Sequence, residues 1–235
     1  MPVPRLAAVL LVATALAAGC SSADRRAASG QAPATTPAPG TSAAGTGAGG
    51  ATSTTATAVA ARHTFPLRGC RYSYSHGHHD YPATDIFAPI GCAVVAPVSG
   101  TVDEVSARDR WTSSSNRGAD RGGLSVSIVG VDGVRYYGSH MSSIAAGVTP
   151  GARVEVGAPL GRVGKSGDAE GSASHLHFGL SWPTRPGVWW VRRGVVDPWP
   201  FLTSWRNGGN LSPAAAVRAA RARAGGTTPP CAVDC

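Results

Sequence analysis

Lysine is almost missing from this chain of 235 residues, in which Lys165 is the single example. Acidic residues number 13 against 21 basic ones, so arginine supplies nearly all of the formal net charge of +8. A basic surface suits an anionic polymer, an anionic membrane face or a nucleic acid. Because the chain has no nucleic-acid-binding motif and no basic helix with interleaved aromatic residues, we expect no nucleic-acid partner.

Long hydrophobic runs are lacking as well. The apolar stretch at residues 6–18 follows Arg5 and is too short to span a bilayer, a pattern typical of a signal peptide over residues 1–19. It ends in Leu16-Ala17-Ala18-Gly19-Cys20, which resembles the lipobox of bacterial lipoproteins, although Ala17 stands where the lipobox usually has leucine. The resemblance implies that Cys20 is lipid-modified and anchors the protein to the outer face of the bacterial membrane, facing the cell wall. Simple secretion with cleavage nearby is the alternative.

Aromatic residues are absent from positions 21–62, which consist almost entirely of Ala, Thr, Ser, Gly and Pro. Such a segment has little to bury, so we predict a disordered, lipid-anchored linker over residues 20–62 that spans roughly 35–40 Å. The composition changes at His63, where we place the start of a folded domain over residues 63–206. Residues 207–235 form the predicted C-terminal tail, with a short helix at about 213–224.

Helix signals are scarce before about Ser212, whereas turn formers are abundant, with 31 glycines and 18 prolines. Short apolar or alternating segments separated by turns predict an all-β fold built on antiparallel sheets. A polar, glycine-containing surface loop is expected at residues 111–123. Strands are expected at residues 93–98, 101–106, 124–129, 134–141, 159–163 and 174–182.

The stretch at residues 174–182 alternates polar and apolar side chains with a period of two, which predicts a half-buried strand. His175 and His177 share one face of it, together with Gly179 and Ser181, while the leucines and aromatics point to the core. Six of the seven histidines lie in three short segments, around residues 76–79, at His140 and at residues 175–177. This grouping favours one shared metal site over scattered surface histidines.

Cysteine usage fits an exported protein. Beyond Cys20, four cysteines remain, and four cysteines allow three pairings. We favour the local pairs Cys70–Cys92 and Cys231–Cys235, the first of which closes a loop worth roughly 3 kcal/mol in the chain-entropy model. Zinc binding by these cysteines is the alternative, and their unequal spacing and exported setting argue against it.

Several motifs in residues 70–180 resemble, in order and spacing, those of the lysostaphin-type, or LytM-like, zinc metallopeptidases. They are Asp85-Ile86-Phe87-Ala88-Pro89-Ile90-Gly91, Val94-Val95-Ala96-Pro97-Val98-Ser99-Gly100-Thr101-Val102, Tyr137-Gly138-Ser139-His140, Val154-Glu155-Val156-Gly157-Ala158-Pro159-Leu160-Gly161 and His175-Leu176-His177-Phe178. The resemblance implies an antiparallel β-sheet or sandwich core of the duplicated-hybrid-motif type.

The same resemblance implies a zinc-dependent endopeptidase that hydrolyses peptide bonds of bacterial peptidoglycan. One Zn²⁺ per chain is expected to be held by a histidine of the first segment, Asp85 and His177, with His140 and His175 as the catalytic pair that does not bind metal. Three protein ligands leave one tetrahedral position open. We expect a monomer that binds peptidoglycan peptides. A catalytically inactive relative that binds wall or regulates another wall hydrolase is the alternative.

The first metal ligand departs from the family pattern, which has a histidine four places before the aspartate. Tyr81 stands at that position here. His79 lies six places before Asp85, two places further than the family pattern. Because side chains of a strand alternate between its two faces, a two-residue insertion keeps His79 on the same face as Asp85. We therefore predict His79 as the ligand, with His78 as the alternative.

Overall fold

The computed structural model describes residues 61–76, 78 and 80–232. The predicted signal peptide, the lipidation site Cys20 and nearly all of the predicted linker lie outside these residues. His79 and Cys235 lie outside them too, so the roles predicted for both stay predictions.

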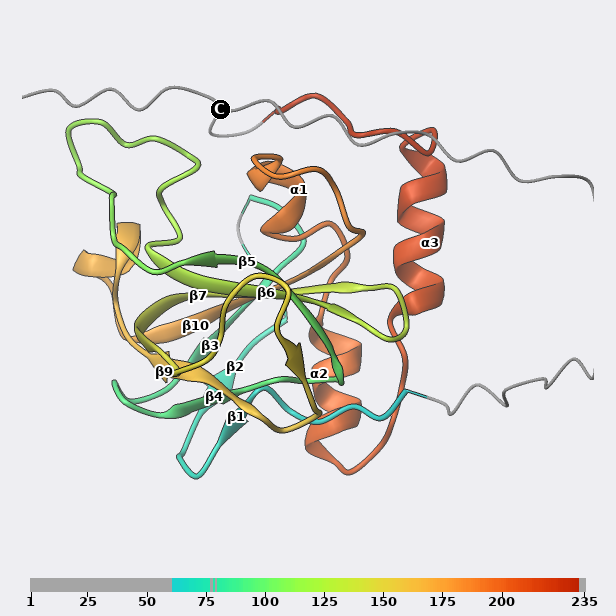
Figure 1. The fold of residues 1–235 in the computed structure, drawn as a ribbon, viewed down its shortest axis with the longest axis horizontal. Coiled ribbons are helices and arrows are strands. Elements are labelled where there is room, and N and C mark those ends of the chain that lie inside the picture. Colours follow the sequence, from blue (N-terminus) through green and yellow to red (C-terminus); the bar gives the residue numbers. More distant parts are fainter. Residues whose placement is uncertain (1–60, 77, 79, 233–235) are drawn as a thin grey trace, which may run out of the picture. The chain divides into compact units, whose positions relative to one another are not determined.

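Ten strands of the described residues form one antiparallel sheet, which confirms the predicted all-β fold class (Figure 1). Its main path runs β1-β4-β9-β7-β10-β3-β2, while β5 pairs with β6 and β8, and β6 also pairs with β7. The strands are β1 (Leu67–Arg68), β2 (Ser73–Tyr74), β3 (Thr84–Phe87), β4 (Ala93–Val95), β5 (Gly100–Ser106), β6 (Leu124–Gly130), β7 (Arg135–Ile144), β8 (Arg153–Val154), β9 (Pro159–Val163) and β10 (His175–Ser181).

The β6–β7 hairpin shows how local sequence sets the register. Gly133 adopts a φ of +76°, a left-handed conformation that glycine takes without a steric penalty. The backbone N–H of Val134 donates to the Asp132 carboxylate, which closes the turn. Val129 therefore pairs with Arg135, and the long strand β7 is directed along β10 on its other side.

Strand β10 lies in the middle of the main path, between β7 and β3. Leu176, Phe178 and Leu180 are buried in the hydrophobic core, as the alternation predicted. The prediction of a half-buried strand was wrong, because His175, His177 and Ser181 on the opposite face are buried too. Segments outside the sheet cover that face.

Three α-helices follow β10 in the described part of the chain, and two of them contradict the expectation of no helix before Ser212. They are α1 (Trp189–Arg192), α2 (Trp199–Arg206) and α3 (Ala214–Arg223), and a 3₁₀ turn spans Gly167–Gly171 between β9 and β10. Helix α2 buries Phe201, Leu202 and Trp205 in the core. Helix α3 matches the predicted tail helix, and its buried Val217 and Ala220 join the same core. Within the described residues, no helix has the length and apolar character that crossing a membrane requires.

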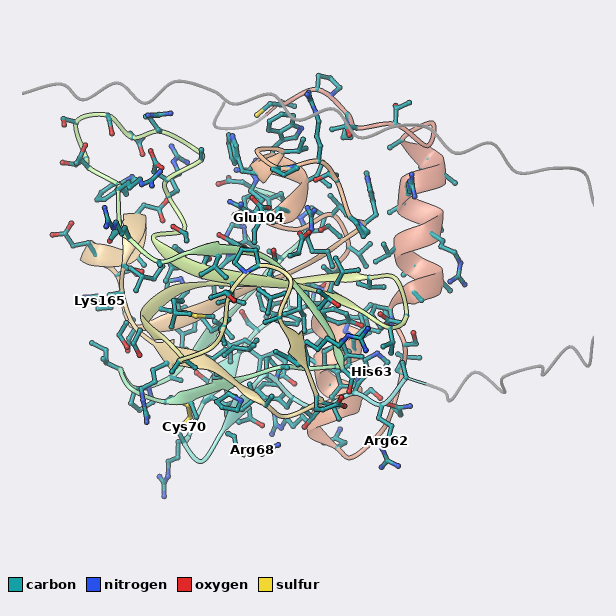
Figure 2. The ribbon with its side chains drawn as sticks, viewed as in Figure 1. Arg62, His63, Arg68, Cys70, Glu104 and Lys165 are labelled. Carbon is teal, nitrogen blue, oxygen red and sulfur yellow. A yellow bond between two sulfur atoms is a disulfide. The ribbon has the colours of Figure 1, made fainter. Side chains whose placement is uncertain are left out.

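Two tertiary connections hold the ends of the sheet. The predicted disulfide between Cys70 and Cys92 is present, with Cys70 next to β1 at the sheet (Figure 2). It closes the segment that contains β2 and β3. His63 stacks on Trp205 of α2, with ring centroids 5.3 Å apart, and its Nδ1 lies 3.0 Å from the Asn210 side-chain oxygen. The first residues of the domain are therefore fixed to its C-terminal part.

Candidate metal centre and active site

The register of β10 with its two neighbours assembles the candidate site. His177 pairs with Asp85 on β3 and with Ser139 on β7, so His140 comes directly after a residue opposite His177. Segments more than thirty residues apart in the chain are thus brought together by backbone hydrogen bonds of the sheet.

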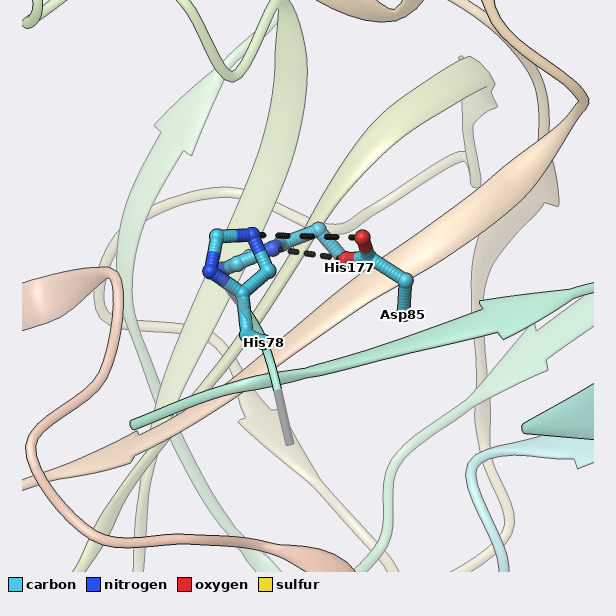
Figure 3. A group of neighbouring side chains, drawn as sticks. All are labelled: His78, Asp85 and His177. Atoms are coloured by element: carbon cyan, nitrogen blue, oxygen red, sulfur yellow. Dashed lines mark hydrogen bonds and ion pairs between the residues drawn. The ribbon is translucent and has the colours of Figure 1, made fainter. Parts of the chain in front are cut away.

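Side chains of His78, Asp85 and His177 converge at this point (Figure 3). Each offers one ligand atom, and these atoms lie within 4.8 Å of one another. His177 Nδ1 is 3.0 Å from Asp85 Oδ1, and His78 Nε2 is 3.9 Å from Asp85 Oδ2. In a tetrahedral zinc site with bonds near 2.0–2.1 Å, ligand atoms are about 3.3 Å apart. Two imidazole nitrogens on either oxygen of the Asp85 carboxylate, at these separations, suit a zinc ion.

The hydrogen bonding of His177 points to the same conclusion. Its Nε2 lies 3.0 Å from the backbone carbonyl oxygen of Arg193, which has only acceptor character, so Nε2 carries a proton. A neutral His177 then directs the lone pair of Nδ1 at a carboxylate oxygen of Asp85. Two such atoms attract each other only through a cation between them, either an additional proton or a metal ion. A carbonyl acceptor on the far nitrogen is also the arrangement that orients metal-binding histidines.

The surroundings of Asp85 favour the ionised carboxylate that a metal ligand must be. Burial by itself raises the pKa of its carboxyl group. The hydrogen bond with His177 and the charge of the neighbouring histidines outweigh burial, however, and hold the pKa well below its usual range. Asp85 is therefore ionised at neutral pH, as a carboxylate ligand must be.

The structure places His78 at the site. The parity argument for His79 assumed an extended chain up to Asp85, but β3 begins only at Thr84, and residues 80–82 form a bend. Strand alternation does not continue through a bend, so parity does not select the ligand. His78 packs on Tyr81 and His177, with ring centroids 4.5 Å and 5.1 Å away. Tyr81 thus forms part of the wall behind the metal position, a role that the sequence analysis missed.

His140 and His175 lie next to each other beside the three ligand candidates, with ring centroids 4.8 Å apart. In each ring Nδ1 is 2.8 Å from a backbone carbonyl oxygen, of Ser166 for His140 and of Ala173 for His175. Those carbonyls fix the proton on Nδ1, which leaves Nε2 as the acceptor. His175 Nε2 lies 3.8 Å from Asp85 Oδ1, so its free nitrogen faces the metal position.

His140 is held in an unusual state. Its φ of +61° is a left-handed conformation that histidine rarely adopts, and its backbone N–H donates to Gly122 in the loop that precedes β6. Burial, assisted by the charges of His177 and His175, lowers the pKa of His140 to about 3. The ring is therefore neutral at physiological pH, and its Nε2 can accept a proton or a hydrogen bond.

These groups line a cavity of about 250 Å³. Besides the predicted residues, its walls include aromatic and charged side chains that the sequence analysis did not assign to the site. They are Tyr81, Phe87, Arg121, Tyr137, Asp168, Trp189, Arg192 and Arg193. Phe87 and Tyr137 lie inside two of the motifs but were given no role, and no motif marked Arg121, Asp168, Trp189, Arg192 or Arg193.

Comparison with known proteins agrees with this geometry. Residues 79–187 match the family model described as Peptidase family M23. Among curated proteins, the chain is 30% identical over 159 residues to the L-Ala--D-Glu endopeptidase of Bacillus subtilis, a match that covers 61% of this chain and 44% of that protein. The chain therefore spans less than half the length of this relative.

Solved structures of similar proteins include the catalytic domain of the antimicrobial peptidase lysostaphin from Staphylococcus simulans. It is 26% identical, covers 57% of this chain and 93% of that one, and has a TM-score of 0.44. A putative glycyl-glycine endopeptidase LytM from Ruminococcus gnavus is 24% identical, with coverage of 64% and 62% and a TM-score of 0.48. The matched family region contains Asp85, His140, His175 and His177, so the part of the chain that carries these candidate site residues is similar to Peptidase family M23.

Proposed function

We propose that the protein is a zinc-dependent endopeptidase that hydrolyses peptide bonds of bacterial peptidoglycan. The observation that carries the proposal is the convergence of His78, Asp85 and His177 beside two more imidazoles whose Nε2 atoms are free to exchange protons. Three protein ligands leave a fourth position open, as a catalytic zinc site requires. A purely structural zinc site is usually closed by four protein ligands instead.

In this proposal His177 binds the metal through Nδ1, while His78 and Asp85 complete the protein ligands. A zinc ion held there supplies Lewis acidity, which makes water more acidic and polarises an amide carbonyl. The Arg193 carbonyl keeps His177 in the tautomer that directs a lone pair at the metal.

His175 and His140 act on the substrate side of the site. His175 Nε2 faces the metal position, so this imidazole takes the proton of the attacking water and returns it to the leaving amine, a contribution typically worth about 10²–10⁴-fold. Burial keeps His140 neutral by lowering its pKa. Because its Nδ1–H is donated to the Ser166 carbonyl, its Nε2 can take up a proton, and the protonated ring then has an N–H that can stabilise developing negative charge.

The substrate class is supported by the similarity of residues 79–187 to Peptidase family M23 and by the relative named as an L-Ala--D-Glu endopeptidase. The net charge of +8 suits an anionic polymer such as the cell wall. We also propose export and anchoring through a lipid on Cys20, which is supported by the apolar run before Ala17-Ala18-Gly19-Cys20. Mass spectrometry of the mature N-terminus tests the anchor, and an unmodified Cys20 would contradict it.

The decisive experiment measures the release of peptides from purified peptidoglycan by the zinc-loaded protein. Cleavage should stop with a chelator and return when zinc is added. Catalytically inactive binding to the wall, the alternative function, predicts sedimentation with peptidoglycan and no new peptide termini in either condition.

The ligand assignment is tested separately with a matched pair of variants, His78→Ala and His79→Ala. We expect the first to lose bound zinc and the second to retain it, because His78 reaches Asp85 and His177. Full zinc content in the His78 variant, with loss in the His79 variant, would restore the assignment based on strand parity.

A further inference from the structure

The point at which the chain joins the folded domain is fixed to the segment that precedes helix α3. The Asn210 side chain accepts a hydrogen bond from the backbone N–H of His63 at 2.7 Å and donates one to the Ala61 carbonyl at 2.9 Å. His63 is fixed in turn by its stacking on Trp205 of α2. Figure 2 shows Arg62 and His63 below the first turn of α3. The residues before Ala61 are therefore connected to the domain beside this helix.

The exposed side of α3 carries positive charge without acidic neighbours in sequence. One face of the helix is packed into the core, whereas Arg218, Arg221 and Arg223 are exposed. No position from 198 to 232 is an aspartate or a glutamate. Within the described part of the chain these three arginines form no ion pair. Their charges are therefore available to a partner.

Two exposed apolar side chains lie at the same end of the domain. Of the four large hydrophobic side chains that are exposed among the described residues, Val131 is 67% exposed and Leu211 is 49% exposed. Leu211 follows Asn210, and Val131 precedes Asp132, whose carboxylate lies 3.2 Å from His63. A single exposed apolar residue is ordinary, but these two adjoin a group of unpaired arginines.

Asp132 does not offset this positive charge at the surface. Its side chain is only 6% exposed, lies beside His63 and accepts a hydrogen bond from the Tyr136 hydroxyl at 2.6 Å. The surface where the chain joins the domain therefore presents basic and apolar side chains together. We call this surface the junction patch; it consists of Arg62, Val131, Leu211, Arg218, Arg221 and Arg223.

We propose that the junction patch docks the domain on an anionic membrane. This inference rests on the proposed anchoring through Cys20, because an anchor there holds the domain near lipid and makes docking an intramolecular event. Arginines pair with anionic headgroups, while apolar side chains enter the boundary between headgroups and acyl chains. An anionic polymer offers the charge without an apolar layer, so exposed Val131 and Leu211 favour a membrane as the partner.

Docking through the junction patch leaves the catalytic cavity accessible. The loop between β5 and β6 forms one wall of the cavity, through Gly118, Ala119, Arg121 and Gly122. Figure 1 shows this loop on the opposite flank of the domain from α3. No residue of the junction patch lines the cavity. A membrane on the α3 side therefore does not cover this wall of the cavity.

The test measures the binding of unlipidated protein to lipid vesicles. Residues 20–235 contain every described strand and helix, and Cys20→Ser removes the proposed lipid site. Sedimentation at low salt compares vesicles of phosphatidylcholine with vesicles of equal parts phosphatidylcholine and phosphatidylglycerol. An arginine near anionic lipid contributes about 5-fold, so Arg218→Gln, Arg221→Gln and Arg223→Gln together should weaken binding to the anionic vesicles by roughly 100-fold. Glutamine keeps the helix propensity of arginine.

The matched control changes the same number of charges on the β5–β6 loop. Arg108→Gln, Arg110→Gln and Arg117→Gln together replace three exposed arginines. Binding should stay within about 5-fold of the parent protein, because charges beyond a Debye length from the membrane are screened.

The apolar part of the patch is tested by Val131→Ser with Leu211→Ser. This pair should weaken binding by about 10-fold, because less apolar area leaves water. Ile90→Ser is its control, at a position that is 62% exposed and outside the patch, and it should bind as the parent protein does.

Equal losses in the two arginine triples, or equal binding to the two kinds of vesicle, would overturn the inference. Stronger patch-dependent binding to isolated cell wall than to anionic vesicles would also overturn it and make the patch a polymer site. Peptide release from purified peptidoglycan should be the same in both triples, since neither set lines the cavity. Patch-dependent vesicle binding without any peptide release would support the inference and refute the proposed peptidase function instead.

Discussion

Replacement of Gly179 by alanine should weaken metal binding, although residue 179 contacts no metal ligand through a side chain. The new Cβ would lie 2.1 Å from the Arg193 oxygen and 2.6 Å from its carbonyl carbon, whereas ordinary contacts begin at 3.4 Å. Both neighbours are backbone atoms in a close-packed region, so the 193–194 segment must move by more than about 1 Å. The His177–Arg193 hydrogen bond, now 3.0 Å, would then be lost.

Loss of a carbonyl that orients a metal-binding histidine typically lowers metal affinity by about 10-fold to 100-fold. Overpacking adds a destabilisation of about 1–3 kcal/mol. The assay is zinc competition against a chromophoric chelator, with urea denaturation of the metal-free protein as the second measurement. Gly171→Ala is the control, because nothing lies within 4 Å of the Cβ it would add. Equal zinc affinity in the two variants would refute the orienting role of the Arg193 carbonyl.

Three further outcomes are expected. Separate His140→Ala and His175→Ala variants should retain zinc and lose about 10²–10⁴-fold in kcat, and loss of zinc from either would make it a ligand instead. Burial lowers the pKa of His140 from 6.5 to about 3. Between these two pH values the unfolded chain is protonated at His140 and the folded chain is not. The unfolding free energy of the metal-free protein should therefore fall from pH 6.5 towards pH 3, by up to about 1.4 kcal/mol per pH unit, and less steeply in His140→Ala. Replacing Cys70 and Cys92 by serine should cost roughly 3 kcal/mol in denaturant unfolding, and an unchanged midpoint would contradict this.

Strands were predictable because their signal is local. The alternation at residues 174–182 and the hairpin turn before Val134 depend on neighbouring residues alone, and the structure has β10 and the β6–β7 hairpin there. Helices α1 and α2 gave no comparable signal. Helix α1 has four residues, and its Trp190 donates to the Pro229 carbonyl at 2.8 Å, so contacts distant in sequence hold it in place.

The choice between His78 and His79 as the first metal ligand could not be made from the local sequence. Strand parity is a property of an extended chain, and the bend at residues 80–82 lies outside strand β3. His78 lies at the site among Tyr81 and His177, whose contact with each other joins residues nearly one hundred positions apart.

The chain by itself determined the chemistry of the candidate site. The residue types that bind metal, their grouping and the alternation of the strands that carry them are all properties of short stretches of sequence. Tertiary structure alone decided which atoms meet: the register that sets His177 opposite Asp85, the carbonyl that orients His177, and the arginine that reaches the cavity from beyond β10. The physical reason is that residue types and periodicity are short-range properties, whereas distances of 3 Å between remote side chains depend on the packing of the whole domain.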